Sequence, residues 1–164
     1  MSVKTVMDRI FAINQKVTVT NSADEAVNIR TYRTYPTKFD PSTVPLITAV
    51  PGTGTFLKNY GNADEYTLVT ESMNVEIIVR TTDYFADADK GVAQLLAEKL
   101  MDSVKQVYWA RPRLELNGGD ELDCLTEEAL LGNRANFVPV PSNQLEIVFN
   151  LSVKFETKIA RVTP

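Results

Sequence analysis

Acidic clusters come nearest to a chemical site in this sequence. They are Asp64/Glu65, Asp87/Asp89, Asp120/Glu121/Asp123 and Glu127/Glu128. Paired carboxylates can hold divalent cations or act as general acid and base. Residues 117–123 superficially resemble a calcium loop, but they lack the ligand spacing of an EF-hand. We therefore expect a solvated acidic loop, and keep a metal-dependent hydrolase that uses residues 120–128 as the less favoured alternative.

The other residue types exclude several familiar sites. The sequence contains no histidine and a single cysteine, Cys124. Ser–His–Asp and Cys–His catalysis, imidazole-based zinc sites and an intrachain disulfide are therefore excluded. Residues 51–55 contain two glycines but lack the lysine of a phosphate-binding loop, so they predict only a turn. A basic-aromatic group of Tyr108, Trp109, Arg111 and Arg113 could contact phosphates, but at a helix end we expect these side chains to cap carbonyls and pack. We predict no enzyme activity, no bound metal and no cofactor.

Length and composition indicate a single domain over residues 1–164. Of these 164 residues, 44% are hydrophobic and 23% charged, the balance of an ordinary folded protein. The net charge of −4 argues against a dedicated nucleic-acid binder. No apolar stretch is long enough for a membrane span, and the N-terminus lacks the pattern of a signal peptide. We therefore expect a protein that stays in the cytosol where it is made.

The spacing of apolar residues predicts an α+β fold, with a mainly antiparallel sheet and helices packed on one face. Spacings of three and four predict helices over 3–17 and from Asp87 or Asp89 to about residue 108. Alternating or short apolar runs predict strands. These lie at 27–35, 44–50, 65–81 and 145–156. The region 114–142 is a possible acidic hairpin or loop insert, with a short strand at Leu114 and Leu116 and a helical turn after Thr126.

Two groups of apolar residues fall where the sequence predicts connections. Phe56, Leu57 and Tyr60 lie in a Gly- and Asn-rich loop at 55–62, and Tyr84 and Phe85 precede the second helix. Such side chains either fold back onto the domain or contact a partner.

The final strand is the clearest element. Six consecutive odd positions from Leu145 to Phe155 are apolar, so about a dozen residues form one half-buried strand, longer than usual. This length suggests a strand that extends beyond the core, or a curved sheet shared with neighbours.

The chain resembles the tail terminator (tail completion) proteins of long-tailed bacteriophages, of the lambda minor tail protein U type. The resemblance lies in an N-terminal amphipathic helix, a strand that ends in Tyr35-Pro36, and the run Val44-Pro45-Leu46-Ile47-Thr48-Ala49-Val50-Pro51-Gly52. A long strand, a second helix and the final alternating strand complete it. It covers roughly residues 3–157, and the segment 108–142 departs from it.

The resemblance implies a structural role in the virion. It implies a homo-oligomer, a hexameric ring that caps the tail tube, stops its polymerisation and provides the docking surface for the neck and head. DNA passes through the ring without specific binding, and assembly takes place in the cytoplasm of the host bacterium. The apolar side chains of Phe56, Leu57, Tyr60, Tyr84 and Phe85 then face partners. Contacts between subunits are implied for alternate positions of the last strand, namely Glu146, Val148, Asn150, Ser152 and Lys154.

Three alternatives stay open beside this reading. A head–tail connector or stopper of the phage neck has a similar construction and is the nearest. A metal-dependent hydrolase predicts stoichiometric binding of Ca²⁺, Mg²⁺ or Mn²⁺. A small regulatory binding module predicts a monomer or dimer instead of a ring.

Overall fold

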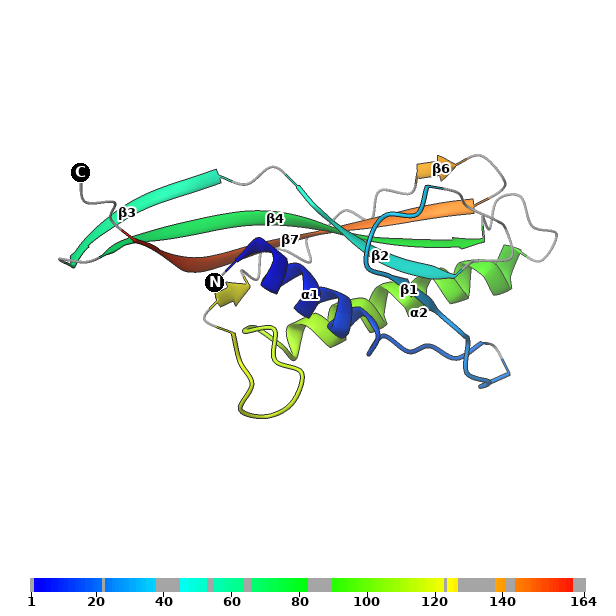
Figure 1. The fold of residues 1–164 in the computed structure, drawn as a ribbon. Coiled ribbons are helices and arrows are strands. Elements are labelled where there is room, and N and C mark those ends of the chain that lie inside the picture. The colour runs from blue at the N-terminus through cyan, green and yellow to red at the C-terminus, as the bar shows by residue number, and fades with distance from the viewer. Residues whose placement is uncertain are drawn as a thin grey trace.

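The computed structural model describes residues 2–21, 23–37, 45–52, 55–63, 66–82, 90–122, 124–126, 138–140 and 144–160. These residues form two helices, α1 (Val3–Asn14) and α2 (Lys90–Trp109). The strands are β1 (Arg30–Tyr32), β2 (Leu46–Pro51), β3 (Thr55–Ala63), β4 (Tyr66–Thr82), β5 (Cys124–Thr126), β6 (Val138–Val140) and β7 (Gln144–Ala160). The predicted α+β fold is confirmed, with both helices on one face of a mostly antiparallel sheet (Figure 1). None of the helices described is long and apolar enough to cross a membrane.

The sheet is built on one long pair of strands. Strands β4 and β7 have 17 residues each and pair in antiparallel register from Tyr66–Ala160 to Thr82–Gln144. The strand order is β1-β2-β4-β7-β5, with β3 added beside β4 and β6 beside β7. The β1–β2 pair is the one parallel pair among these strands. Every other described strand is therefore placed by its register on β4 or β7, directly or through β2.

The core lies between the sheet and the two helices. Odd-numbered positions of β4 and β7 face this core, because successive side chains of a strand alternate between its two faces. Its sheet side includes Met73, Val75, Ile77, Val79, Ile147, Phe149, Leu151, Val153 and Phe155, all buried. Val6, Ile10 and Ile13 of α1 supply the opposite side at the predicted helical spacing. Ser2 caps this helix, since its Oγ accepts a hydrogen bond from the Thr5 backbone N–H at 3.2 Å.

Two predictions of local structure are wrong. Residues 55–62, predicted as a loop, belong to β3, which pairs with β4. The pairing register shifts between Leu57 and Gly61, so a bulge accommodates the Gly- and Asn-rich sequence that suggested a loop. Leu114, predicted in a short strand, is instead buried in a turn with φ of 51°. The strand predicted over 27–35 is present but shorter, at Arg30–Tyr32.

The region 114–142 contributes to the sheet. Strands β5 and β6 both pair with β7, so the segment is joined to the sheet at two points. Thr126 lies in β5. The helical turn predicted after it, and the residues Tyr84 and Phe85, lie outside the described residues.

We predict that Thr48→Val leaves stability unchanged or raises it. Thr48 is fully buried on β2, and its Oγ1 has no hydrogen-bond partner in the described structure. A buried hydroxyl without a partner costs about 1–3 kcal/mol, and a methyl group of similar size removes that cost. Denaturant unfolding should show an increase of up to ~1 kcal/mol in the free energy of unfolding. The mirror control Val79→Thr places a hydroxyl in the core and should lose about 1–3 kcal/mol. A large loss in the free energy of unfolding for Thr48→Val would show that the Thr48 hydroxyl does have a hydrogen-bond partner.

Candidate assembly surfaces

The candidate positions of the last strand share the sheet face opposite the helices. Glu146, Val148, Asn150, Ser152 and Lys154 alternate along β7 with the buried core residues, so their side chains point away from the core. Their neighbours in register on β4 are Arg80, Ile78, Glu76, Asn74 and Ser72. These side chains therefore line the face of a strand that is already paired with β4 along its whole length. A partner that used these side chains would pack on this face of the sheet.

The sheet face opposite the helices is called the second face below. One end of it is closed by an ion pair. Arg80 Nε donates to Glu146 Oε2 at 2.9 Å, and the two side chains are only 9% and 16% exposed. Arg80 Nη2 also donates to the Tyr35 hydroxyl at 2.8 Å, and its guanidinium lies 5.8 Å from the centre of the Tyr35 ring. Burial, followed by the charge of Glu146, raises the pKa of Tyr35. The cluster joins the segment after β1 to β4 and β7, and Leu46 is buried beside Arg80 in register.

The other end of the second face is polar and open to solvent. Asn74, Glu76 and Asn150 are exposed there, and the Ser72 and Ser152 hydroxyls lie 3.4 Å apart across the β4–β7 pair. Gly52 continues this face beyond β2, donating its backbone N–H to Asn74 O at 2.7 Å. Amide, hydroxyl and carboxylate groups in register suit a hydrated protein partner rather than an apolar ligand.

A three-stranded arm extends from this open end. Strand β3 and the far portions of β4 and β7 project past both helices, on the left of Figure 1. The arm is held by backbone pairing of β3 with residues 66–72 of β4, and of β4 with residues 154–160 of β7. Phe56, Leu57 and Tyr60 lie in this arm, and their role as partner contacts stays a prediction.

The acidic loop after α2 is fastened to α1 by Asp120. Its Oδ1 accepts backbone N–H bonds from Leu116 and Asn117 at 2.8 and 3.0 Å. Its Oδ2 accepts from Arg9 Nη1 at 3.0 Å, and Arg9 also donates to the Leu114 and Asp120 carbonyls. The Asn117 amide, then the Leu116 amide and Arg9, lower the pKa of this carboxyl below its ordinary 3.8.

These contacts give Asp120 a structural role. Protein donors engage both of its oxygens and would compete with a divalent cation for this carboxylate. Within the described part of the chain, no three acidic or cysteine side chains are grouped to share a metal ion. Asp123, Glu127 and Glu128 lie outside the described residues. The structure therefore does not test the hydrolase alternative at these three positions.

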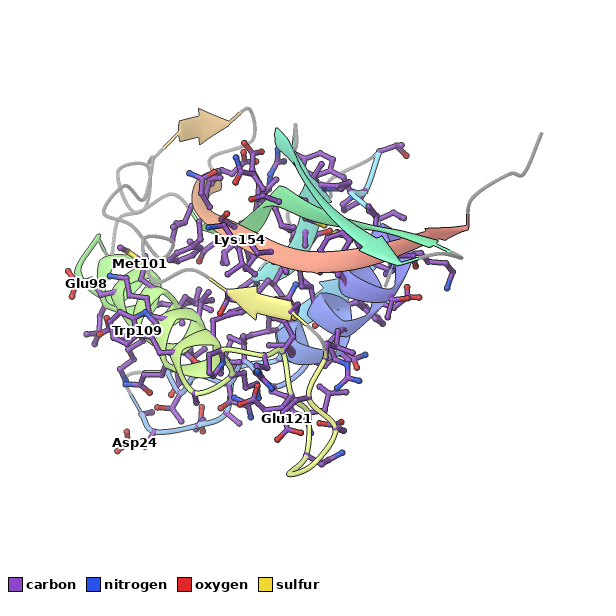
Figure 2. The ribbon with its side chains drawn as sticks, turned by 90° about the vertical axis from the view of Figure 1, so that its left-hand side faces the viewer. Asp24, Glu98, Met101, Trp109, Glu121 and Lys154 are labelled. Carbon is purple, nitrogen blue, oxygen red and sulfur yellow. The ribbon has the colours of Figure 1, made fainter. Side chains whose placement is uncertain are left out.

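The four members of the predicted basic-aromatic group at the end of α2 lie in different environments. Arg111 caps the helix as expected, donating from Nη1 to Val107 O at 2.8 Å. Tyr108 is buried and donates to Asn14 Oδ1 at 2.7 Å, which joins α2 to α1; burial raises the pKa of its hydroxyl. Trp109 was expected to pack, but it is 63% exposed on the outer side of α2 (Figure 2). Arg113 is exposed on the loop that follows.

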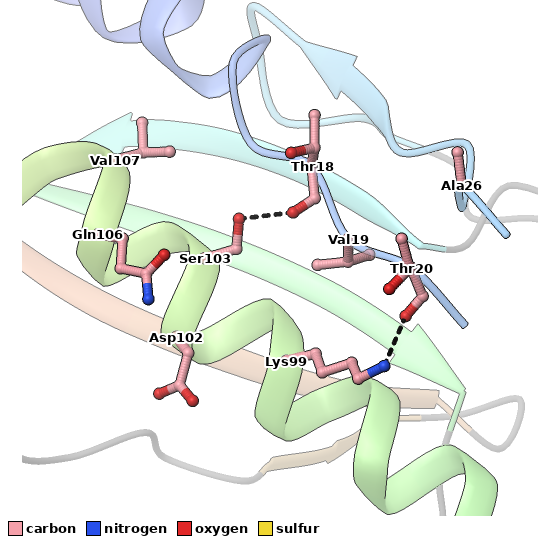
Figure 3. Close-up of a pocket in the computed structure, with 9 residues that line it drawn as sticks. All are labelled: Thr18, Val19, Thr20, Ala26, Lys99, Asp102, Ser103, Gln106 and Val107. Atoms are coloured by element: carbon pink, nitrogen blue, oxygen red, sulfur yellow. Dashed lines mark hydrogen bonds between the residues drawn. The ribbon is translucent and has the colours of Figure 1, made fainter. Parts of the chain in front are cut away.

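A groove of about 460 Å³, lined by both polar and apolar side chains, runs between α2 and the segment that follows α1. Ser103 Oγ donates to Thr18 O at 2.7 Å, and Lys99 Nζ lies 3.3 Å from Thr20 O (Figure 3). Residues four apart on a helix and two apart on a strand are both separated by about 6–7 Å, so the two donors match the two carbonyls. This match explains how the segment lies along α2, and sequence periodicity gave no sign of it.

Comparison with known proteins adds no relative. A scan against protein-family models and a search of curated proteins both found no match for this chain. Function is therefore inferred from the sequence resemblance and from the surfaces described above.

We predict that Arg80 and Glu146 are strongly coupled. Arg80→Leu leaves the Glu146 carboxylate without its guanidinium in a site that is 16% exposed, and should lower the free energy of unfolding by about 2–3 kcal/mol. The double variant Arg80→Leu/Glu146→Leu should recover most of this loss, because it removes both charges. Urea unfolding of the four chains in this cycle measures the coupling. Strictly additive losses would contradict it.

We also predict a pH-dependent opening of the 114–122 loop. Since the pKa of Asp120 is lowered by folding, its stabilising contribution is full above pH 3.8 and is lost as the pH falls through the lowered value. Amide hydrogen exchange at Leu116 and Asn117, corrected for intrinsic rates, should show this loss of protection. In Asp120→Asn the pH dependence should disappear, whereas Glu121→Gln should keep it. Equal pH dependence in Asp120→Asn would overturn this role.

Proposed function

We propose that this chain is a structural subunit of a phage tail, a tail terminator whose copies form a ring on the end of the tail tube. The observation that carries the proposal is the three-stranded arm of β3, β4 and β7, which projects beyond the helical layer. A single domain gains no core from strands that extend past its helices. Such an arm gives neighbouring subunits or the tube a large surface to pack on.

The second face of the sheet supports the same proposal. Its open end presents Asn74, Glu76 and Asn150 to solvent in register, while its closed end is fixed by the Arg80–Glu146 pair. Interfaces of this composition are hydrogen-bonded and hydrated, as in assemblies whose parts exist separately before they join. The face that the resemblance relates to subunit contacts is therefore closed by an ion pair at one end, and polar and accessible toward the other.

The charge of the protein is compatible with a ring around DNA. A chain with a net charge of −4 offers little attraction to phosphates, so DNA could pass a central channel without being held. The proposed partners are other copies of this chain, the tail-tube subunit and a neck protein. A virion location at the tail end follows from the same proposal.

Imaging of the purified protein tests the ring directly. We expect negative-stain images to show closed particles with a central pore, six-fold in projection, and light scattering to give a matching mass. The protein should be imaged alone and after mixing with preassembled tail tubes, where the particles should sit at one tube end. Two-fold dimers, open filaments, or a species that stays monomeric both alone and with tubes would contradict the proposal.

A further inference from the structure

The loop between α2 and β5 carries the single Asn-Gly pair of the chain. Asn117, Gly118 and Gly119 are all exposed, and the loop that holds them projects from the rest of the protein in Figure 1. The Asp120 N–H donates to Asn117 O at 3.3 Å, and Gly119 has a φ of 91°, which closes a turn over these four residues. The pair therefore lies in an exposed turn, outside the sheet and both helices.

The two groups of this pair that can react with each other are free of hydrogen bonds to the described part of the chain. The Asn117 side-chain amide forms none, and the Gly118 backbone N–H has no acceptor there. The nitrogen of residue 118 and the Cγ of residue 117 are placed by their covalent connection to close a five-membered ring. Because Gly118 has no side chain, its nitrogen can approach Cγ without steric hindrance, and its backbone rotates more freely than that of any other residue.

Asn21 also precedes a small residue, Ser22, but its amide is fixed. Its Oδ1 accepts hydrogen bonds from the backbone N–H groups of Ala23 and Glu25 at 2.9 and 3.0 Å. Its Nδ2 donates to Glu25 Oε2 at 3.0 Å. A reaction at the Asn21 Cγ would have to break these hydrogen bonds first. The structure therefore separates a restrained asparagine at residue 21 from an unrestrained one at residue 117.

We propose that Asn117 is a site of spontaneous deamidation, which converts it to aspartate or isoaspartate. The Gly118 nitrogen loses its proton to solvent and attacks Asn117 Cγ, so that an N–Cγ bond forms. The Cγ–Nδ2 bond breaks, and ammonia leaves with a proton taken from water, which yields a cyclic imide. Water then opens the ring at Cγ to give aspartate, or at the main-chain carbonyl carbon to give isoaspartate. The reaction consumes water, releases ammonia and requires no oxidant or reductant.

Both products weaken the contact that holds this loop to Asp120. Each adds a carboxylate to residues 115–123, which already contain four acidic and no basic residues. In isoaspartate the main chain also passes through Cβ and Cγ, and the former carbonyl that accepts from the Asp120 N–H becomes a free carboxylate. The Asn117 N–H, which donates to Asp120 Oδ1 at 3.0 Å, then loses the turn that positions it. We therefore expect the loop to loosen from Arg9 as the protein ages. This inference does not depend on the ring proposal, because it concerns the folded chain alone.

Peptide mass mapping of the aged, folded protein tests the site. The protein is incubated at mildly alkaline pH and then digested with pepsin in acid, so that the digestion itself does not form the imide. Fragmentation should locate the mass change from NH₂ to OH at Asn117 and identify isoaspartate. We expect Asn117 to react at least roughly tenfold faster than Asn21, whose hydrogen bonds must break first. A rate at Asn117 no higher than at Asn21 would overturn the proposal. So would an Asn117 that stays intact in the folded protein while it reacts fully in the urea-unfolded chain.

Gly118→Ala provides a matched control. A Cβ at residue 118 would meet no atom within 4 Å, and Gly118 is not among the residues with positive φ, so alanine fits the turn. Circular dichroism should therefore show a fold like that of the wild type. Deamidation of Asn117 should be several-fold slower, because the added methyl group hinders the approach of the nitrogen to Cγ. An unchanged rate in Gly118→Ala would overturn the assignment of the Gly118 nitrogen as the attacking group.

Amide hydrogen exchange tests the consequence for the loop. In the isoaspartate form, separated from the fresh protein by ion exchange, protection at Leu116 should fall by roughly tenfold, because its bond to Asp120 is weakened. Freshly purified Asn117→Asp adds the charge but keeps the main chain, so it should lose less protection. Full protection at Leu116 in the isoaspartate form would contradict the loosening, while the deamidation site itself would still stand on the mass mapping.

Discussion

The antiparallel pairing of β4 with β7 is the constraint on which the rest of the structure depends. Its register fixes which side chains face the helices and which face away, because a shift of one residue would exchange the two sets. The apolar odd positions must meet α1 and α2, so a register shifted by one residue would leave them outside the core. The short strands β5 and β6 and the hairpin partner β3 are then held at defined points along this pair.

The same pairing explains why the protein has a fixed core and an accessible surface in one sheet. Where helices cover the sheet, Val75, Ile77 and Leu151 are fully buried or nearly so. Beyond the helices the ladder continues on backbone hydrogen bonds, which do not require a covered face. Sequence-independent pairing thus lets the sheet extend as an arm. On the opposite face, Arg80 and Glu146 can be withdrawn from water because each satisfies the charge of the other.

Charged residues in this protein hold loops in place as well as covering the surface. Arg9 and Asp8 are adjacent on α1, yet they bind in different directions, to Asp120 in the loop after α2 and to Arg33 after β1. α1 therefore joins the loop after α2 to the segment after β1.

The sequence by itself determined the two helices, the two long strands and the sides that they bury, because apolar periodicity reports directly on which face leaves water. It also excluded histidine- and disulfide-based chemistry, since those residues are absent. Only the tertiary structure decided that residues 55–62 form a strand, because β4 supplies the hydrogen-bonding partner that local composition does not reveal. It likewise decided that Asp120 is a structural anchor and that Trp109 is exposed, since both depend on residues distant in sequence or on the direction in which a helix end points.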